Sequence, residues 1–240
     1  MFDMLNLLAC GLTLACSQDP CFEFRHAQVD HIVCSFRTDR NRVEVRHANE
    51  SGKAYGSLFR YHQNLEVPPL MSMNGGMYHE DLSPVGLYVE QGRRDQRIST
   101  RGGFGNFHLL PNGVFWVKGN KVGVTETRSY ISKRVAPDFA TQSGPMLVID
   151  GKLHPRFIEG SDSLKIRNGV GINQKGSRVT FAISKQPVNF WNFGTFFRDI
   201  LEAENALFLD GTVSTIRSRN FKMRSWRSIG PIIAVFPNEP

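Results

Sequence analysis

Two apolar segments near the C-terminus each end on a polar side chain that could contact a ligand. Asp210 follows the apolar run 205–209, and Ser184 closes the run 178–184. Between these runs, apolar residues recur at the spacing of one helix face: Phe193, Phe196, Phe197, Ile200 and Leu201. This order predicts a strand, a helix over 193–204 and a second strand, joined as one parallel βαβ unit.

The two polar residues are expected to share one site. Parallel strands end at the same edge of a sheet, and open α/β sheets bind ligands at that edge. We therefore expect Ser184 and Asp210 to face one ligand. The alternative for Asp210-Gly211 is a plain turn, because Asp-Gly is also a common turn sequence.

Several well-known catalytic and cofactor motifs are absent from the sequence. The histidines lack HExxH or HxxxH spacing and no CxxC occurs, so we predict no metal site and no zinc hydrolase. Residues 102–105 lack the third glycine of the dinucleotide fingerprint, and the sequence has neither a P-loop nor a GxSxG elbow. We therefore expect no cofactor.

Four short segments carry a resemblance to a known family. They are Met73-Asn74-Gly75-Gly76-Met77-Tyr78, Gln142-Ser143-Gly144-Pro145 with Asp150-Gly151, Arg167-Asn168-Gly169-Val170-Gly171, and Leu209-Asp210-Gly211 with Ser214. In this order they resemble motifs of the phosphodiester glycosidase family, the domain of the mannose-6-phosphate uncovering enzyme. The resemblance spans about residues 70–217.

The resemblance implies a hydrolase that splits the bond between a sugar's anomeric carbon and a phosphodiester. Its substrate would be a glycan or sugar phosphate in an envelope polysaccharide or oligosaccharide. Because the leaving phosphate is already a weak base, strong general-acid help matters less than in ordinary glycoside cleavage. Such a site needs an anion clamp, a carboxylate near the anomeric carbon and anchors for the sugar hydroxyls.

The resemblance also implies roles for residues at the motifs. Asp210 is the expected nucleophile, base or electrostatic stabiliser, and Arg167 is the expected phosphate clamp, with a surface salt bridge as the alternative. Asn74 completes the predicted catalytic set. The predicted substrate-binding residues are Gly75, Gly76, Tyr78, Gln142, Ser143, Gly144, Asn168, Ser184, Gly211 and Ser214. The site would also need a second carboxylate, and the sequence does not decide between Glu80, Asp81, Glu90 and Asp150.

One motif departs from the family pattern. Thr212 and Val213 replace two glycines of the Asp-Gly-Gly-Gly-Ser loop, and a β-branched pair leaves less room for a ligand against the backbone. An alternative function is therefore a carbohydrate- or phosphate-binding envelope protein without catalysis.

Composition indicates one globular domain. The chain has 240 residues, 40% hydrophobic and 21% charged, with 18 phenylalanines that need burial. The net charge of +7 comes from 29 basic and 22 acidic residues. These charges are dispersed along the chain, so we predict no nucleic-acid partner.

The N-terminal residues 1–16 are short and apolar, as in a signal peptide. Thr13-Leu14-Ala15-Cys16 is close to a lipobox, so Cys16 is a candidate lipid anchor and the expected location is periplasmic or extracellular. The alternative is a buried N-terminal segment of a cytoplasmic protein. Cys21 and Cys34 would form a disulfide after export and stay unpaired thiols otherwise.

The predicted fold is a single α+β domain over residues 21–237, with mixed sheets of short strands, few helices and the C-terminal parallel βαβ unit. Besides the strands of that unit, strands are predicted at 29–36, 42–47, 70–73, 85–90, 107–109, 114–117 and 146–149. The motif loops are expected to converge on one cleft. Asn74, Arg167 and Asp210 must then lie close together.

Overall fold

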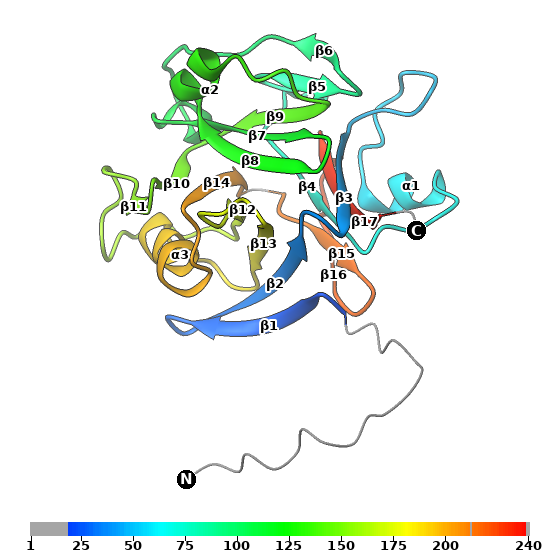
Figure 1. Ribbon diagram of the computed structural model, residues 1–240. Helices are drawn as coiled ribbons and strands as arrows, with labels where there is room; N and C mark the ends of the chain where they lie inside the picture. Colours follow the sequence, from blue (N-terminus) through cyan, green and yellow to red (C-terminus); the bar gives the residue numbers. More distant parts are fainter. Residues whose placement is uncertain (1–18, 212, 239–240) are drawn as a thin grey trace.

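The computed structural model describes residues 19–211 and 213–238, which fold into three sheets (Figure 1). The predicted signal peptide and Cys16 lie outside these residues. Every pairing between the described strands is antiparallel, and the few helical segments are short. The structure thus has the sheet-rich α+β character expected, but the predicted mixed sheets are wrong, because the described strands pair only antiparallel. No helix in the described residues is long and apolar enough to cross a membrane.

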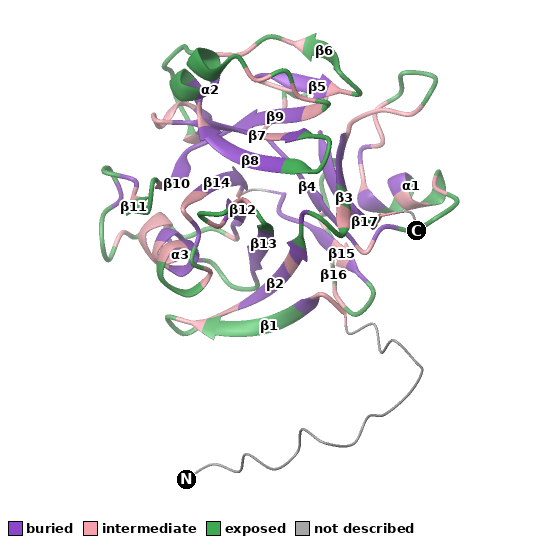
Figure 2. Ribbon diagram, in the orientation of Figure 1, coloured by how far each residue is buried: buried purple, intermediate pink, exposed green. Residues whose placement is uncertain are grey.

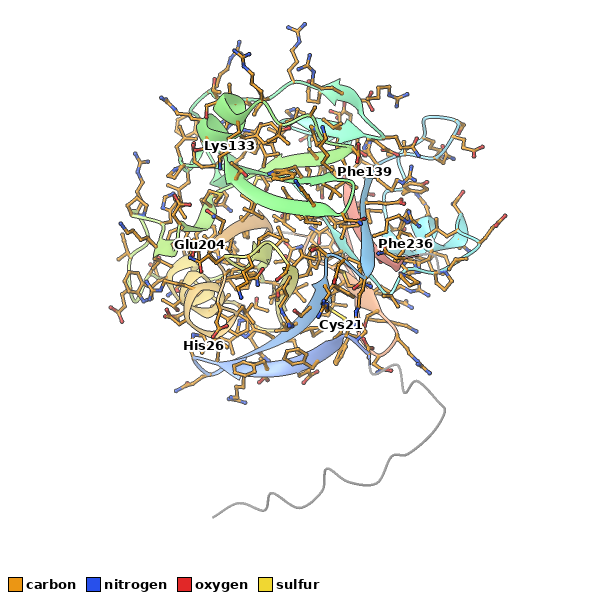
Figure 3. The ribbon with its side chains drawn as sticks, viewed as in Figure 1. Cys21, His26, Lys133, Phe139, Glu204 and Phe236 are labelled. Carbon is orange, nitrogen blue, oxygen red and sulfur yellow. A yellow bond between two sulfur atoms is a disulfide. The ribbon has the colours of Figure 1, made fainter. Side chains whose placement is uncertain are left out.

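The largest sheet has seven strands in the order β1-β2-β13-β12-β14-β10-β11. Their bounds are β1 Cys21–His26, β2 Val29–Arg37, β10 Met146–Ile149, β11 Lys152–Leu153, β12 Asn168–Ile172, β13 Arg178–Ser184 and β14 Asn205–Asp210. β10 and β13 have the bounds predicted from sequence. A Cys21–Cys34 disulfide joins the directly opposed residues of β1 and β2 (Figure 3).

Two five-stranded sheets complete the fold. The first has the order β16-β15-β4-β17-β3, with β3 Asn41–Arg46, β4 Met71–Asn74, β15 Ile216–Ser218, β16 Lys222–Met223 and β17 Ile232–Pro237. The second has the order β6-β5-β9-β7-β8, with β5 Tyr88–Glu90, β6 Arg93–Gln96, β7 Gly113–Lys118, β8 Lys121–Glu126 and β9 Phe139–Ser143. Side chains from all three sheets meet in one core, whose strands are mostly buried in Figure 2.

The helical segments lie at the outside of these sheets. They are α1 Leu58–Gln63, α2 Thr127–Lys133, α3 Phe190–Thr195, the single 3₁₀ turn Asn106–His108 and the π-helical turn Phe196–Ile200. The strand predicted at 107–109 is wrong, because this short stretch between two loops closes as the 3₁₀ turn. α3 and the π-helical turn pack on one face of the seven-stranded sheet.

The predicted helix and its parallel unit both need correction. The helical segment runs over 190–200, and Phe193, Phe196 and Phe197 are fully buried as their spacing predicted. Ile200 is exposed, because the backbone N–H of Leu201 bonds to the carbonyl of Phe196 in a wider turn that rotates the later residues.

The parallel βαβ unit is wrong, because β12 lies between β13 and β14 and pairs antiparallel with both. β12 comes from an earlier part of the chain, which the local pattern over 178–209 cannot reveal. Since each outer strand opposes β12, β13 and β14 still run in the same direction. Ser184 and Asp210 therefore end at the same edge of the sheet, with the start of β12 between them.

Candidate functional site

Asn168 links three segments at this sheet edge. Its side-chain Nδ2 donates to Asn74 Oδ1 at 2.8 Å and to the Asn74 carbonyl at 3.0 Å. Its Oδ1 accepts the backbone N–H of Asp210 at 2.8 Å. Asn168 is fully buried, so these bonds are shielded from water and fix β4 and β14 against each other.

Asn74 extends this network to the loop after Asp210. Its Oδ1 also accepts the backbone N–H of Thr215 at 2.9 Å. Its Nδ2 is buried and has no hydrogen-bond acceptor among the described residues. An unsatisfied buried amide is costly, so this open donor next to the Asp210 network is a feature of interest.

The loop after β14 folds back over Asp210. Ser214 Oγ donates to the Asp210 carbonyl at 2.9 Å, and its weaker contact is to the Ile166 carbonyl at 3.4 Å. Together with the Asn168 bond, this fixes the backbone on both sides of the Asp210 peptide unit. Asp210 itself is 8% exposed, so its carboxylate is held at the border between the core and the surface.

Asp210 and Gly211 line a cleft of about 660 Å³. The other walls come from three loops: Met77, Tyr78, His79, Glu80, Leu82 and Val85; Phe104, Gly105, Asn106, Phe107 and His108; and Val213, Arg227 and Ser228. This size suits a small or medium ligand such as a sugar phosphate. The cleft joins two of the family-like motifs, those around residues 74–78 and 209–214.

The surroundings of Tyr78 in the cleft change the pKa of its phenol. Burial and the nearby Asp210 carboxylate raise the pKa of the Tyr78 phenol to about 12, and Arg227 opposes this shift. Tyr78 Oη donates to the Ser228 carbonyl at 2.7 Å. The phenol is therefore neutral at neutral pH and is fixed by its own donated bond.

Arg167 directly precedes β12, faces the Phe190 ring of α3 and is only 1% exposed. Its Nε donates to the Val188 carbonyl at 2.8 Å, and its guanidinium carbon lies 3.5 Å from the ring centroid of Phe190. Burial lowers its pKa to about 10, so it stays charged at neutral pH. Its Nη1 has no acceptor among the described residues.

These contacts place the Arg167 guanidinium in a pocket of carbonyls and aromatic rings beneath α3. It is not among the described residues that line the cleft. The phosphate-clamp role of Arg167 stays a prediction, and its contacts favour a structural role. The surface salt bridge considered as the alternative is wrong, because the residue is buried.

Ser184 supports Arg167 and does not face the cleft. Its Oγ accepts the Arg167 backbone N–H at 3.0 Å, and its own N–H donates to the Arg167 carbonyl at 2.9 Å. Ser184 is fully buried. It therefore closes the β12–β13 ladder beside the site, and its contact with a ligand stays a prediction.

The Gln142-Ser143-Gly144 segment forms hydrogen bonds and packing contacts with the loops around the site. Gln142 Oε1 accepts the backbone N–H groups of Leu87 and Ser99, at 3.1 and 2.9 Å. Its Nε2 donates to the Ser99 carbonyl and to Thr127 Oγ1. Both ends of the amide are thus in use, and Gln142 holds loops in place. Its predicted contact with substrate has no support from these bonds.

The other two residues of that segment also have internal contacts. Ser143 Oγ donates to the Leu209 carbonyl at 2.9 Å, one residue before Asp210. A Cβ at Gly144 would lie 2.6 Å from the Cβ of Asn112. The segment therefore braces β14 and packs against the loop that precedes β7.

Close packing requires glycine at both positions of the Gly75-Gly76 turn, which follows β4. A Cβ on Gly75 would lie 2.4 Å from Ile233 Cγ1, and one on Gly76 would lie 2.3 Å from Thr141 Oγ1. Gly76 also has a φ of +94°, which favours glycine. The Gly75 N–H donates to the Pro231 carbonyl at 2.7 Å, so it is engaged within the protein.

The candidates for a second carboxylate separate clearly. Only Glu80 lines the cleft among the four described candidates. Asp81 caps its own turn by accepting from Ser83, and Asp150 lies in the exposed β10–β11 turn. Glu90 accepts from Tyr88 and pairs with Arg46 in another part of the fold.

Several residues at the site were missed from the sequence. Thr215 joins the Asn74 network and directly follows Ser214, so it lay within reach of the motif. Arg227, Phe104 and His108 line the cleft from loops without a distinctive pattern. Within the described residues, no group of three or more His, Cys, Asp or Glu side chains is arranged to hold a metal ion.

The geometry can be compared with known proteins. The family model of the phosphodiester glycosidases matches residues 69–236. The chain belongs to this family. The match includes every residue of the Asn74–Asn168–Asp210 network.

A curated relative and solved structures agree with this assignment. The Escherichia coli (strain K12) protein YigE is 41% identical over 176 residues, which are 72% of this chain and 68% of that protein. The catalytic domain of zebrafish N-acetylglucosamine-1-phosphodiester alpha-N-acetylglucosaminidase, auto-inhibited by its pro-peptide, aligns with a TM-score of 0.62 and 14% identity. That alignment covers 90% of this chain and 81% of the zebrafish chain.

A second solved structure shows the same fold. A hypothetical protein from Synechocystis has a TM-score of 0.58 and 12% identity, over 91% of this chain and 61% of its own. At these identities, the solved structures show the fold and leave the substrate to be established.

Proposed function

We propose that this protein is a hydrolase that cleaves a sugar-1-phosphodiester bond and releases a sugar and a phosphomonoester. The observation that carries the proposal is Asp210 at the border of a 660 Å³ cleft, with its backbone bonded to Asn168 and Ser214. Family membership supports the reaction class, and the Asp210 carboxyl group on a fixed main chain at the cleft supports the position of the chemistry.

Asp210 would act at the anomeric carbon. As bond cleavage begins, positive charge develops on the sugar, and a carboxylate held close by stabilises it or attacks it directly. The Asn168 and Ser214 contacts hold the Asp210 main chain, from which the carboxylate projects, so its Cα needs no reorganisation during the reaction. This preorganisation is what gives such a carboxylate its catalytic value.

The cleft also offers partners for the phosphate and for water. Arg227 is the cation on the cleft wall, so it is placed to balance a phosphodiester. Glu80 is placed across the same cleft and would serve as the second carboxylate, activating water. The neutral Tyr78 phenol and the Asn106 side chain are polar groups of the cleft wall that could contact the sugar.

The test is turnover of a methyl diester of GlcNAc-1-phosphate, measured as released sugar. Asp210→Asn should fold with an unchanged melting temperature and lose about 100-fold or more in kcat. The matched control is Asp150→Asn, an exposed turn aspartate outside the cleft, which should keep full activity. Equal activity of Asp210→Asn and wild type would overturn the assignment of the site.

A second pair of variants tests the second carboxylate. Glu80→Gln should lower kcat about 10-fold to 100-fold, whereas the neighbouring Asp81→Asn should change it less than about 2-fold. Both side chains are exposed, so neither change disturbs the core. Similar losses in both variants would show that loop structure, not the Glu80 carboxylate, is responsible.

The non-catalytic alternative has one observation in its favour. Val213, where the family has glycine, is buried and lines the cleft wall, and it packs in the cluster that includes Leu58 and Ile229. A narrower cleft could bind a glycan without cleaving it. Saturable glycan binding with no sugar released from any glycosyl phosphodiester would favour this function.

We further propose that the protein works after export, in the periplasm or outside the cell, with Cys16 as a lipid anchor. The Cys21–Cys34 disulfide supports export, because structural disulfides persist in oxidising compartments. Mass spectrometry of the mature N-terminus tests this: a chain that still begins at Met1 in the envelope fraction would contradict it.

A further inference from the structure

The segment 216–227, called here the basic hairpin, is the most one-sided charged region of the described chain. It contains β15, β16 and the loop that follows them. Its basic residues are Arg217, Arg219, Lys222, Arg224 and Arg227. No acidic residue occurs between 213 and 238, so these charges have no acidic neighbour along the chain.

One acidic residue contacts the hairpin: Asp19 Oδ2 accepts the backbone N–H of Asn220 at 2.9 Å, and Asp19 lines the second hollow described below. None of the five cations forms an ion pair within the described residues, 19–211 and 213–238. Elsewhere, many arginines are neutralised: Arg37 pairs with Asp39 and Arg93 pairs with Asp95. Unpaired cations on one hairpin create a positive potential that attracts anions.

Two hollows lie along the basic hairpin. One, of about 340 Å³, has Arg217, Lys222, Arg224 and Arg227 on its walls. The other, of about 390 Å³, shares Arg217 and Lys222 with it. The first hollow has an apolar floor that includes Leu58 and Ile229, which suits the carbon skeleton of a sugar.

The first hollow adjoins the proposed active-site cleft at Arg227. Arg227 lines both the cleft with Asp210 and the first hollow, and Arg217 and Lys222 line both hollows. The three cavities therefore follow one another along the hairpin. Trp226, 83% exposed, stacks against the Arg227 guanidinium at 4.3 Å, and Phe59, 59% exposed, lines the first hollow. Exposed rings beside a polar groove are suited to stack on sugars.

We propose that the basic hairpin is a second binding site, which holds further phosphates of a polyanionic glycan while one of its bonds lies at Asp210. This rests on the proposed function and specifies its substrate: a polymer with repeated phosphates, not an isolated diester. Each phosphate beyond the one in the cleft meets an unpaired cation, so affinity grows with chain length and falls with added salt.

A nucleic acid is also a polyanion, so the proposal must distinguish the two. The continuity of the hollows with the cleft favours the glycan, because a chain of sugar-1-phosphate units places the bond to be cleaved and the extra charges in one molecule. Nucleic acid has no sugar-1-phosphodiester bond to offer Asp210. Single-stranded DNA of equal charge is therefore a competitor to be measured.

The kinetic test compares a monomer with an oligomer. The monomer is the methyl diester of GlcNAc-1-phosphate, and the oligomer is a linear chain of about six GlcNAc-1-phosphate units, one charge per unit. The triple variant Arg217→Gln, Lys222→Gln, Arg224→Gln removes three cations and leaves Arg227 in the cleft. Its loss in kcat/KM should be about 10-fold greater on the oligomer than on the monomer, mainly through KM, and its salt dependence should be weaker.

The matched control removes three exposed cations from β7, β8 and α2 at the other end of the molecule, none of which forms an ion pair with another described residue. It is Lys118→Gln, Lys121→Gln, Lys133→Gln, and Figure 3 marks Lys133 at the far side from the basic hairpin. This variant has the same net charge as the hairpin variant. Its ratio of kcat/KM on the oligomer to kcat/KM on the monomer should equal that of wild type. Equal effects of the two triple variants would overturn the proposal, because the effect would then be net charge alone.

A binding measurement separates this inference from the proposed function. In the Asp210→Asn background, fluorescence anisotropy follows the labelled oligomer, and the hairpin triple variant should bind it about 10-fold more weakly. Wild type that binds the oligomer at the hairpin yet cleaves neither substrate would overturn the proposed function alone. DNA that binds the hairpin as tightly as the oligomer would overturn the glycan assignment.

Discussion

Two adjacent residues, Arg167 and Asn168, face opposite sides of the seven-stranded sheet and meet opposite environments. Asn168 faces the interior between the sheets, where every polar atom of its side chain bonds to Asn74 or Asp210. Arg167 faces α3, where its guanidinium lies on the ring of Phe190 and keeps one buried N–H group unbonded.

The strand continues this division. Val170 and Ile172 belong with Asn168 to the core between the sheets. Gly169 and Gly171 follow Arg167 and lie under the π-helical turn, where a Cβ on Gly171 would be 2.8 Å from Phe197 Cδ1. The difference shows that one motif can supply both a bonding residue for the site and a packing face for its support, because successive strand residues point to opposite sides.

The largest expected loss of stability and turnover comes from replacing Asn168, on the face of the strand that points to the site. Asn168→Ala leaves the acceptors on Asn74 and the Asp210 N–H without their partner, so we expect a loss of about 2–4 kcal/mol in the free energy of unfolding. Turnover of the monomeric diester should fall about 100-fold at a temperature where the variant is folded. Denaturant unfolding and kcat together check this, and unchanged turnover would separate the network from the site.

The next prediction concerns the opposite face, where Gly171 packs against the π-helical turn. Gly171→Ala places a methyl group against Phe197 and Ala203, so we expect about 1–3 kcal/mol of destabilisation and little change in KM. A thermal melt and Michaelis–Menten kinetics are the measurements. Gly176→Ala is a poor control because that glycine has a positive φ; Gly102→Ala, whose Cβ meets nothing within 4 Å, is the matched one.

Arg167→Met tests directly whether Arg167 has a structural role or binds phosphate. Methionine keeps much of the packing but loses the bonds to the Val188 and Ser163 carbonyls, so we expect about 1–2 kcal/mol of destabilisation. If Arg167 is structural, kcat/KM should stay within about 3-fold of wild type; a phosphate clamp would lose about 100-fold. The second result would restore the role predicted from the sequence.

The last prediction is a pH dependence on the α3 side, which is absent at neutral pH and develops only in acid. His31 stacks on Phe196 at 4.2 Å, and burial lowers its pKa to about 4. Between the unfolded value of about 6.5 and this folded value, the unfolded state binds the extra proton, so stability falls as pH drops through that window. His31→Phe should flatten this slope; an unchanged slope would assign it to other groups, such as His62 and His154.

The sheet-rich α+β character could be predicted from the sequence, but the way in which the strands assemble could not. Strand 146–149 and strand 178–184 follow from their own composition, and Asp210 was placed at a strand end from the apolar run before it. The insertion of β12 depends on partners far along the chain. The burial of Arg167 depends on Phe190 in α3, which no pattern around the motif contains.

The network residues come from distant parts of the chain, and this affects how the protein folds. Asn74 bonds to Asn168 across 94 positions and to Thr215 across 141. Bringing such separated segments together has a large entropic cost before any of these bonds forms, so chains of this kind fold slowly. A nascent chain that has not yet emerged past Thr215 cannot complete the polar network. The cleft with Asp210 is therefore one of the last parts to form, and activity reports the folding of nearly the whole chain.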